Sequence, residues 1–137
     1  MQTEKLSDIW NYANIEESYG VEAENHMKMR NASVIMINEA QFFEDLVPIV
    51  KSMLKENKTI YIFGLDGDFK CERFGGVLDL VPMSDNVTKL ASFCNLCKDG
   101  TPGIFSLRLT NEKEQMLIGS DNYVPVCRGC YNKHRDM

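Results

Sequence analysis

The stretch Val34-Ile35-Met36-Ile37-Asn38-Glu39 decides the fold class of this chain. A short apolar run that stops abruptly at polar residues is typical of a buried parallel strand whose carboxyl end presents side chains to a ligand. Apolar residues at helical spacing follow within 46–54, and a second β-rich run at 59–63 ends in the polar, glycine-containing segment 64–68. Strand, helix and strand within about thirty residues predict a right-handed βαβ unit, and hence an α/β fold with a parallel sheet.

The composition is that of a globular protein. The 137 residues are the length of one ordinary domain. Hydrophobic residues make up 44% and charged residues 26% of the chain, and this composition excludes general disorder. No apolar run approaches the roughly 20 residues of a membrane span, and the first residues lack the apolar core of a signal peptide. We therefore expect a soluble cytoplasmic protein without membrane contact. Residues 1–26 hold one base and six acids, which account for the whole net charge of −5, so nucleic acid is not an expected partner.

The acidic N-terminal segment contains a predicted helix. Leu6 and Trp10 lie at helical spacing with the acid Asp8 between them, and Ser7 or Asp8 is predicted to cap the start of the helix.

Four of the five cysteines form two C-x-x-C pairs, Cys94 with Cys97 and Cys127 with Cys130, separated by 29 residues. Two such pairs supply the tetrahedral four-sulfur set of a structural zinc site, with no position left open for a catalytic water. The alternatives are unligated thiols, two redox pairs, or an iron site of the same geometry. Cys71 stands outside this pattern and is predicted to pack as a small apolar residue.

The two predicted strands both end in acidic residues, at Asn38-Glu39 and at Asp66-Gly67-Asp68. A Glu just beyond a buried strand, in a ligand crevice, is a reasonable general base. The alternative is a carboxylate that caps a turn or stays in a loop, and the spacing does not separate the two.

Several segments resemble the type II thymidine kinases, the zinc-containing cellular and poxviral class. Residues 34–43 resemble the strand and D-E-[AG]-Q-F-F motif of that family, and residues 64–70 resemble its G-L-D-G-[DT]-F segment. The match continues through Leu80-Val81-Pro82 to the second cysteine pair and covers about residues 34–133. This resemblance implies phosphorylation of the 5′-hydroxyl of thymidine with ATP and Mg²⁺, feedback by thymidine triphosphate, and a homo-oligomer, typically a tetramer.

The resemblance also implies a domain plan. We expect a divergent acidic segment at 1–33, a partial P-loop-kinase-type α/β core at 34–92, and a small zinc-ribbon domain at 93–137. In the family, the segment between the cysteine pairs is a lasso over the nucleoside. Zinc would pin both ends of this lasso and lower the entropy cost of ordering it.

Residue by residue, Glu39 stands at the position of the catalytic base, which would accept the proton of the 5′-hydroxyl. Asn38 stands where the family has the Asp that holds Mg²⁺, and Asn38, Ala40 and Gln41 would line the phosphate site. Phe42, Leu65 and Phe69 would pack on the base, and Phe105 and Ser106 would contact thymine from the lasso. Tyr123 would close the pocket. The residues whose backbone groups would read the base edge are Gln115, Met116, Leu117, Ile118 and Gly119.

Two features depart from the family pattern. The sequence contains no G-x-x-x-x-G-K-[ST] loop, which in such kinases supplies much of the positioning and charge stabilisation of phosphoryl transfer. Asn38 also replaces the metal-holding Asp, so an amide oxygen is kept but its negative charge is lost. We expect Asn38→Asp to raise any activity that exists.

These departures leave three hypotheses open. The first is a thymidine kinase whose phosphate-binding part lies on a separate chain or an upstream segment. The second is an inactive remnant that binds nucleoside or assembles with kinase subunits. The third is a zinc-ribbon interaction module, supported only by basic side chains that otherwise count as surface charge. These basic residues are Lys98, Arg128, Lys133 and Arg135.

Overall fold

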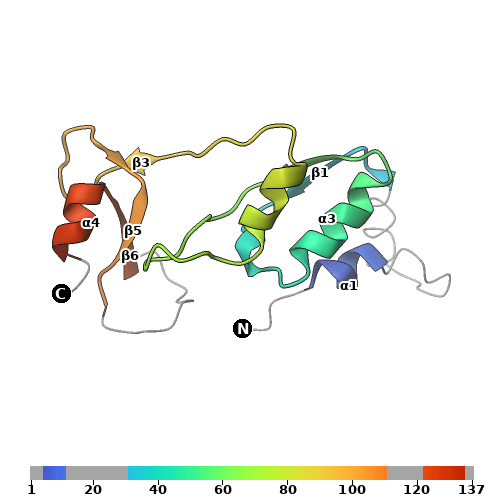
Figure 1. The fold of residues 1–137 in the computed structure, drawn as a ribbon, viewed down its shortest axis with the longest axis horizontal. Coiled ribbons are helices and arrows are strands. Elements are labelled where there is room, and N and C mark those ends of the chain that lie inside the picture. The colour runs from blue at the N-terminus through green and yellow to red at the C-terminus, as the bar shows by residue number, and fades with distance from the viewer. Residues whose placement is uncertain (1–4, 12–30, 111–121, 135–137) are drawn as a thin grey trace. The chain divides into compact units, whose positions relative to one another are not determined.

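The computed structural model describes residues 5–11, 31–110 and 122–134. The chain divides into two compact units (Figure 1). Unit 1 comprises Met1–Asp66 and Phe74–Ser84, and unit 2 comprises Gly67–Arg73 and Asp85–Met137. The predicted domain boundaries, after residues 33 and 92, stay predictions. None of the described helices is long and apolar enough to cross a membrane.

Unit 1 is built on the predicted strand–helix–strand motif. The two strands pair in parallel, with Val34 opposite Thr59 and Ile37 opposite Ile62, and helix α3 connects them. The small parallel sheet is therefore confirmed, whereas the wider P-loop-kinase architecture remains a prediction. The elements of this unit are α1 (Leu6–Asn11), β1 (Val34–Ile37), η2 (Ala40–Phe42), α3 (Leu46–Leu54), β2 (Thr59–Ile62) and η3 (Val77–Met83).

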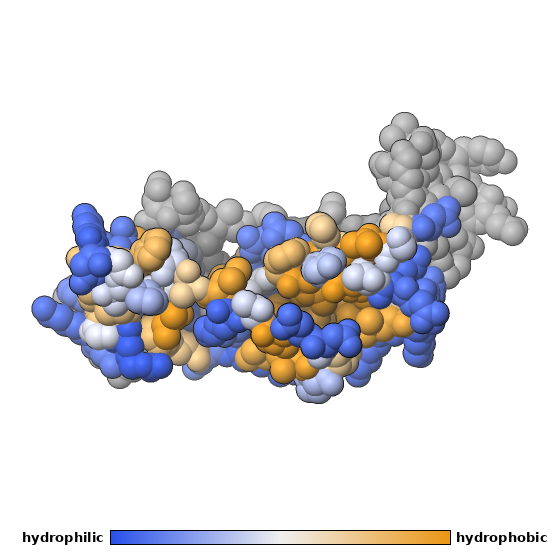
Figure 2. Space-filling view, turned by 90° about the horizontal axis from the view of Figure 1, so that it is seen from above, coloured by the Kyte–Doolittle hydropathy of each residue, from blue (hydrophilic) through white to orange (hydrophobic). Residues whose placement is uncertain are grey.

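The core of unit 1 lies between one face of the sheet and the helices. Because side chains alternate along a strand, Ile35 and Ile37 point into this core, while Val34 and Met36 point away from it. Met36 is 70% exposed, although both faces of parallel sheets are usually covered. In Figure 2, apolar residues gather over the elements of unit 1. The buried core residues are Leu6, Trp10, Ile35, Ile37, Ala40, Leu46, Ile49, Val50, Met53 and Leu80.

The start of α1 is held by a residue far away in the sequence. The backbone N–H groups of Leu6 and Ser7 donate to the two carboxylate oxygens of Asp45, at 2.9 and 2.7 Å. The predicted cap, Ser7 or Asp8, was therefore wrong, because the turn before α3 brings a stronger, charged acceptor to this helix end. Partial burial raises the pKa of Asp45, but hydrogen bonds from Ser7 and Leu6 outweigh it and hold the pKa below 3.8.

The described residues of unit 2 form short antiparallel strand pairs and one helix. Its core is small, with Leu107, Val126 and Tyr131 buried beside Cys94. The segment Gly67–Arg73 belongs to this unit although it follows β2 in the sequence. The elements are β3 (Ser92–Phe93) paired with β4 (Pro102–Gly103), β5 (Phe105–Arg108) paired with β6 (Tyr123–Val126), and α4 (Arg128–His134).

Candidate functional site

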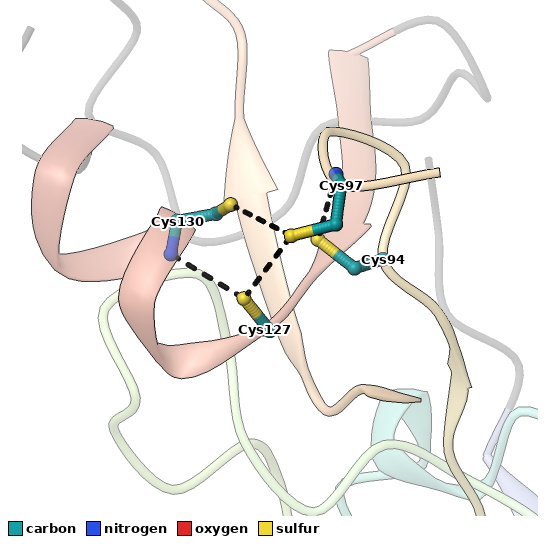
Figure 3. Close-up of side chains that lie close together, drawn as sticks. All are labelled: Cys94, Cys97, Cys127 and Cys130. Atoms are coloured by element: carbon teal, nitrogen blue, oxygen red, sulfur yellow. Dashed lines mark hydrogen bonds between the residues drawn. The ribbon is translucent and has the colours of Figure 1, made fainter. Parts of the chain in front are cut away.

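The four cysteines of the two C-x-x-C pairs converge in unit 2 (Figure 3). Their sulfur atoms all lie within 4.8 Å of one another, and the Sγ of Cys97 is 3.8 Å from that of Cys127 and 3.5 Å from that of Cys130. A Zn–S bond of about 2.3 Å places the sulfurs of a regular tetrahedron about 3.8 Å apart. The spacing therefore fits a four-coordinate zinc ion, and the predicted cysteine cluster is confirmed.

Backbone donors prepare these sulfurs for a metal. The N–H of Cys97 donates to the Sγ of Cys94, and the N–H of Cys130 donates to the Sγ of Cys127, each at 3.5 Å. Burial opposes ionisation of Cys94, but backbone N–H groups, that of Cys127 foremost, lower its pKa to about 6. Hydrogen bonds to its sulfur neighbours, Cys130 foremost, raise the pKa of Cys97 to about 12. A divalent ion bound at this cluster would favour the thiolate form of its ligands.

Glu39, the predicted base, lies at the end of β1 in unit 1. Its backbone is in the left-handed region, with φ 52°, and its side chain is exposed. The buried side chain of Gln41 donates from Nε2 to the Oε2 of Glu39 at 2.6 Å and accepts the N–H of Leu65 at its Oε1, at 3.1 Å. The side-chain amide of Gln41 therefore orients the Glu39 carboxylate, which follows β1, and links it to Leu65, which follows β2.

Two glycines make room for the side chain and the backbone of Gln41. A Cβ on Gly64 would come within 2.8 Å of the Oε1 of Gln41. Gly75 has φ +59°, which favours glycine, and a Cβ there would overlap the backbone oxygen of Gln41. Sequence reasoning did not single out these glycines as part of the site, although Gly64 directly precedes the predicted contact residue Leu65.

The second acidic segment forms a tight turn in unit 2. One carboxylate oxygen of Asp68 accepts the N–H groups of Lys70 and Glu72, at 2.8 and 2.9 Å, and the side chain is 7% exposed. These contacts of Asp68 are those of a carboxylate that caps a turn, which was the alternative to a catalytic role. Cys71 lies on the turn with φ 61° and is exposed. Its predicted burial was wrong, because the turn projects this residue away from the core.

Three predicted nucleoside-contacting aromatics lie in unit 2. The guanidinium carbon of Arg108 lies 3.7 Å from the ring centre of Phe69, and Arg108 also donates to the hydroxyl of Tyr123. The rings of Phe69 and Tyr123 are 6.5 Å apart. The ring of Phe105 stacks on that of Tyr131 at 5.1 Å. Sequence reasoning missed Arg108 and Tyr131, because nothing in their local pattern distinguishes them from surface and core residues.

The other predicted site residues are more scattered. In unit 1, Phe42 packs edge-on against the buried Phe74 at 5.6 Å, and Leu65 is 46% exposed. Asn38 is exposed and lines a hollow of about 360 Å³ along β1, together with side chains of that strand, α1 and Phe43. Ala40 is fully buried, and Ser106 of β5 is half-buried in unit 2. Gln115, Met116, Leu117, Ile118 and Gly119 lie outside the described residues.

Comparisons with known proteins point to one family. A family profile described as thymidine kinase matches residues 4–131. The chain is 47% identical over 100 residues to a thymidine kinase of Oryza sativa subsp. japonica, covering 72% of this chain and 36% of that protein. It is 43% identical over 106 residues to the thymidine kinase of Sheeppox virus (strain KS-1), covering 76% and 58%. It is 41% identical over 102 residues to the cytosolic thymidine kinase of Homo sapiens, covering 74% and 43%. The chain thus spans about a third to three-fifths of the length of these relatives.

Proposed function

The chain belongs to the thymidine kinase family, and on this premise we propose that it supplies part of an ATP-dependent kinase for the 5′-hydroxyl of thymidine. This part would bind the nucleoside and carry the general base. The observation that carries the proposal is the family match itself, whose bounds, residues 4–131, include Glu39, Phe69 and the cysteine cluster. Cytosolic action in nucleotide salvage, feedback by thymidine triphosphate, and a homotetramer belong to the same proposal.

Glu39 has the role of general base in this proposal. It would accept the proton of the 5′-hydroxyl as the oxygen attacks the terminal phosphoryl group of ATP. The hydrogen bond from Gln41 supports this role, because it fixes one carboxylate oxygen and leaves the other available for the hydroxyl. The exposure of Glu39 also supports it, because a base must reach its substrate.

The cysteine cluster would hold a structural zinc, since all four positions of the tetrahedron are filled by sulfur. Phe69, Phe105 and Tyr123 would cover the flat pyrimidine, because aromatic rings pack well on such faces. Bound Mg²⁺ would neutralise charge on the phosphates of ATP. Asn38 would offer only a neutral amide oxygen toward it.

The phosphate-binding loop is the missing part of this assignment. Phosphoryl transfer depends on a loop that cradles the phosphates, and the 137 residues contain no G-x-x-x-x-G-K-[ST] motif. We therefore expect turnover only when a polypeptide that carries this loop is present. The length of the relatives supports this requirement, because each extends well beyond the part that this chain matches.

The proposal is tested by assaying the zinc-loaded chain with thymidine, ATP and Mg²⁺. The assay is run with the chain alone and with the purified N-terminal part of a related kinase added. We expect thymidine monophosphate only in the mixture, and a 10²- to 10⁴-fold lower rate for Glu39→Gln, which keeps an acceptor oxygen but removes the base. Glu44→Gln, which changes an exposed carboxylate five residues later, is the matched control and should leave the phosphorylation rate unchanged.

Other outcomes would separate the alternatives. Thymidine binding without turnover in every mixture would identify an inactive nucleoside-binding remnant. Binding of single-stranded DNA with a steep dependence on salt, and no binding of thymidine, would identify an interaction module.

A further inference from the structure

The hydroxyl of Tyr131 reaches across unit 2 to the main chain of Phe69. Tyr131 lies on α4, is 6% exposed, and donates to the carbonyl oxygen of Phe69 at 2.7 Å. A buried tyrosine hydroxyl needs a hydrogen-bond partner, and this one finds it 62 residues earlier in the sequence. The partner is thus not in the β5–β6 pair that Tyr131 packs against, but in the segment Gly67–Arg73.

Tyr131 is attached directly to the cysteine cluster. It follows Cys130 in the sequence, and its backbone N–H donates to the carbonyl of Cys127 at 2.9 Å. Its ring stacks on Phe105 with an interplanar angle of 28°. The position of the hydroxyl is therefore fixed by the first turn of α4, which itself begins between two of the four sulfur ligands.

The segment Gly67–Arg73 keeps its own shape but depends on its neighbours for its place in unit 2. Asp68 closes the turn from within, through its carboxylate and through its N–H, which donates to the carbonyl of Glu72 at 2.8 Å. The contacts that place the segment come from outside it, from Tyr131 at the Phe69 carbonyl and from Arg108 at the Phe69 ring. Losing an outside contact should therefore let the segment move as a body without unfolding its turn.

We propose that Tyr131 is a positioning residue that couples the metal centre to the segment Gly67–Arg73. A metal bound to the four sulfurs fixes the start of α4, and the Tyr131 hydroxyl then holds the main chain of Phe69 in one place. The consequence for thymidine, namely that Phe69 is pre-positioned against the base, rests on the proposed function, whereas the coupling itself does not.

The test compares Tyr131→Phe with the wild-type chain, both zinc-loaded, by backbone ¹⁵N NMR order parameters. The variant keeps the stacked ring and loses only the hydroxyl. We expect order parameters at residues 67–73 to fall from about 0.85 toward 0.6, with zinc content unchanged. Tyr61→Phe, the same change at a half-exposed tyrosine of unit 1, is the matched control and should leave these residues unaffected. Unchanged order parameters in Tyr131→Phe would overturn the proposal, as would a fall that comes with loss of zinc.

A thymidine titration of the same proteins separates the coupling from the proposed function. If both hold, Tyr131→Phe weakens thymidine binding about five-fold, the effect of one hydrogen bond. Loss of order at 67–73 in a chain that never binds thymidine would leave the coupling intact and refute the nucleoside site. Intact order with wild-type thymidine affinity in the variant would refute the coupling alone.

Discussion

Among the described residues, the apolar core cluster of unit 1 contains ten buried residues around two strands and their helices, whereas that of unit 2 contains four, one of them a cysteine of the four-cysteine cluster. A small unit that cannot bury enough apolar surface needs disulfides, a metal or a partner to remain folded. Unit 1 therefore depends on apolar packing, and we expect unit 2 to depend on an ion held by its four cysteines. The two halves of one chain should accordingly fail under different treatments.

The largest expected effect is the loss of unit 2 on removal of the metal. Zinc binding in zinc-finger peptides provides about 10–16 kcal/mol at neutral pH, which matches or exceeds the whole stability of a typical domain. We expect a strong chelator, or Cys127→Ser, to abolish the amide protection of unit 2 in NMR hydrogen exchange. Fluorescence of Trp10, the only tryptophan and a buried residue of unit 1, should stay native.

Cys71→Ser is the matched control for this experiment. Cys71 is an exposed thiol of the same unit but not one of the four clustered cysteines, so zinc content and exchange should match the wild type. Persistent protection of unit 2 after complete removal of zinc would show that its small apolar core is sufficient. The contrast between the units would then disappear.

A smaller effect, confined to unit 1, is expected from truncating its core. Met53 is fully buried on α3, and Met53→Ala should destabilise unit 1 by about 2–5 kcal/mol through lost burial and the cavity that remains. Urea unfolding followed by Trp10 fluorescence measures this change, and zinc content should not change. Leu54→Ala, at a neighbouring position that is 39% exposed, should cost much less. Equal effects of the two variants would contradict the packing assigned to α3.

The sequence predicted those features that local pattern encodes. The parallel strand pair follows from two apolar runs with a helix between them, and the cysteine cluster follows from the spacing of four residues. Both signals are contained in short segments whose period or spacing has few structural solutions. The wider P-loop-kinase architecture rests on the family resemblance and not on such signals, and it stays a prediction.

The contacts that organise the candidate site were not predictable in the same way. The contact of Arg108 with the Phe69 ring joins residues 39 positions apart, and the hydrogen bond from the Tyr131 hydroxyl to the Phe69 carbonyl joins residues 62 positions apart. The role of Gln41 at the phosphate site stays a prediction, and its contacts to Glu39 and Leu65 had no signal in the sequence. No propensity or period specifies such pairs, because each depends on which segments the fold brings together.

The smallest expected effect concerns the carboxylate of Asp45, which caps α1 within unit 1. Asp45→Asn should reduce the stability of unit 1 at pH 7 by about 1 kcal/mol, since one of the two anionic acceptors at the helix start is lost. Because folding lowers the pKa of Asp45 from its ordinary value of 3.8, this contribution is present above about pH 3.8 and is lost as the pH falls through the folded pKa. Urea midpoints from Trp10 fluorescence should therefore differ between variant and wild type at pH 7, and the difference should shrink as the pH falls below 3.8 and through the folded pKa of Asp45. Glu44→Gln, a neutralisation of the adjacent exposed acid, provides the comparison at both pH values. A difference that persists in acid would show that the shape of the side chain, not its charge, holds α1 to the turn before α3.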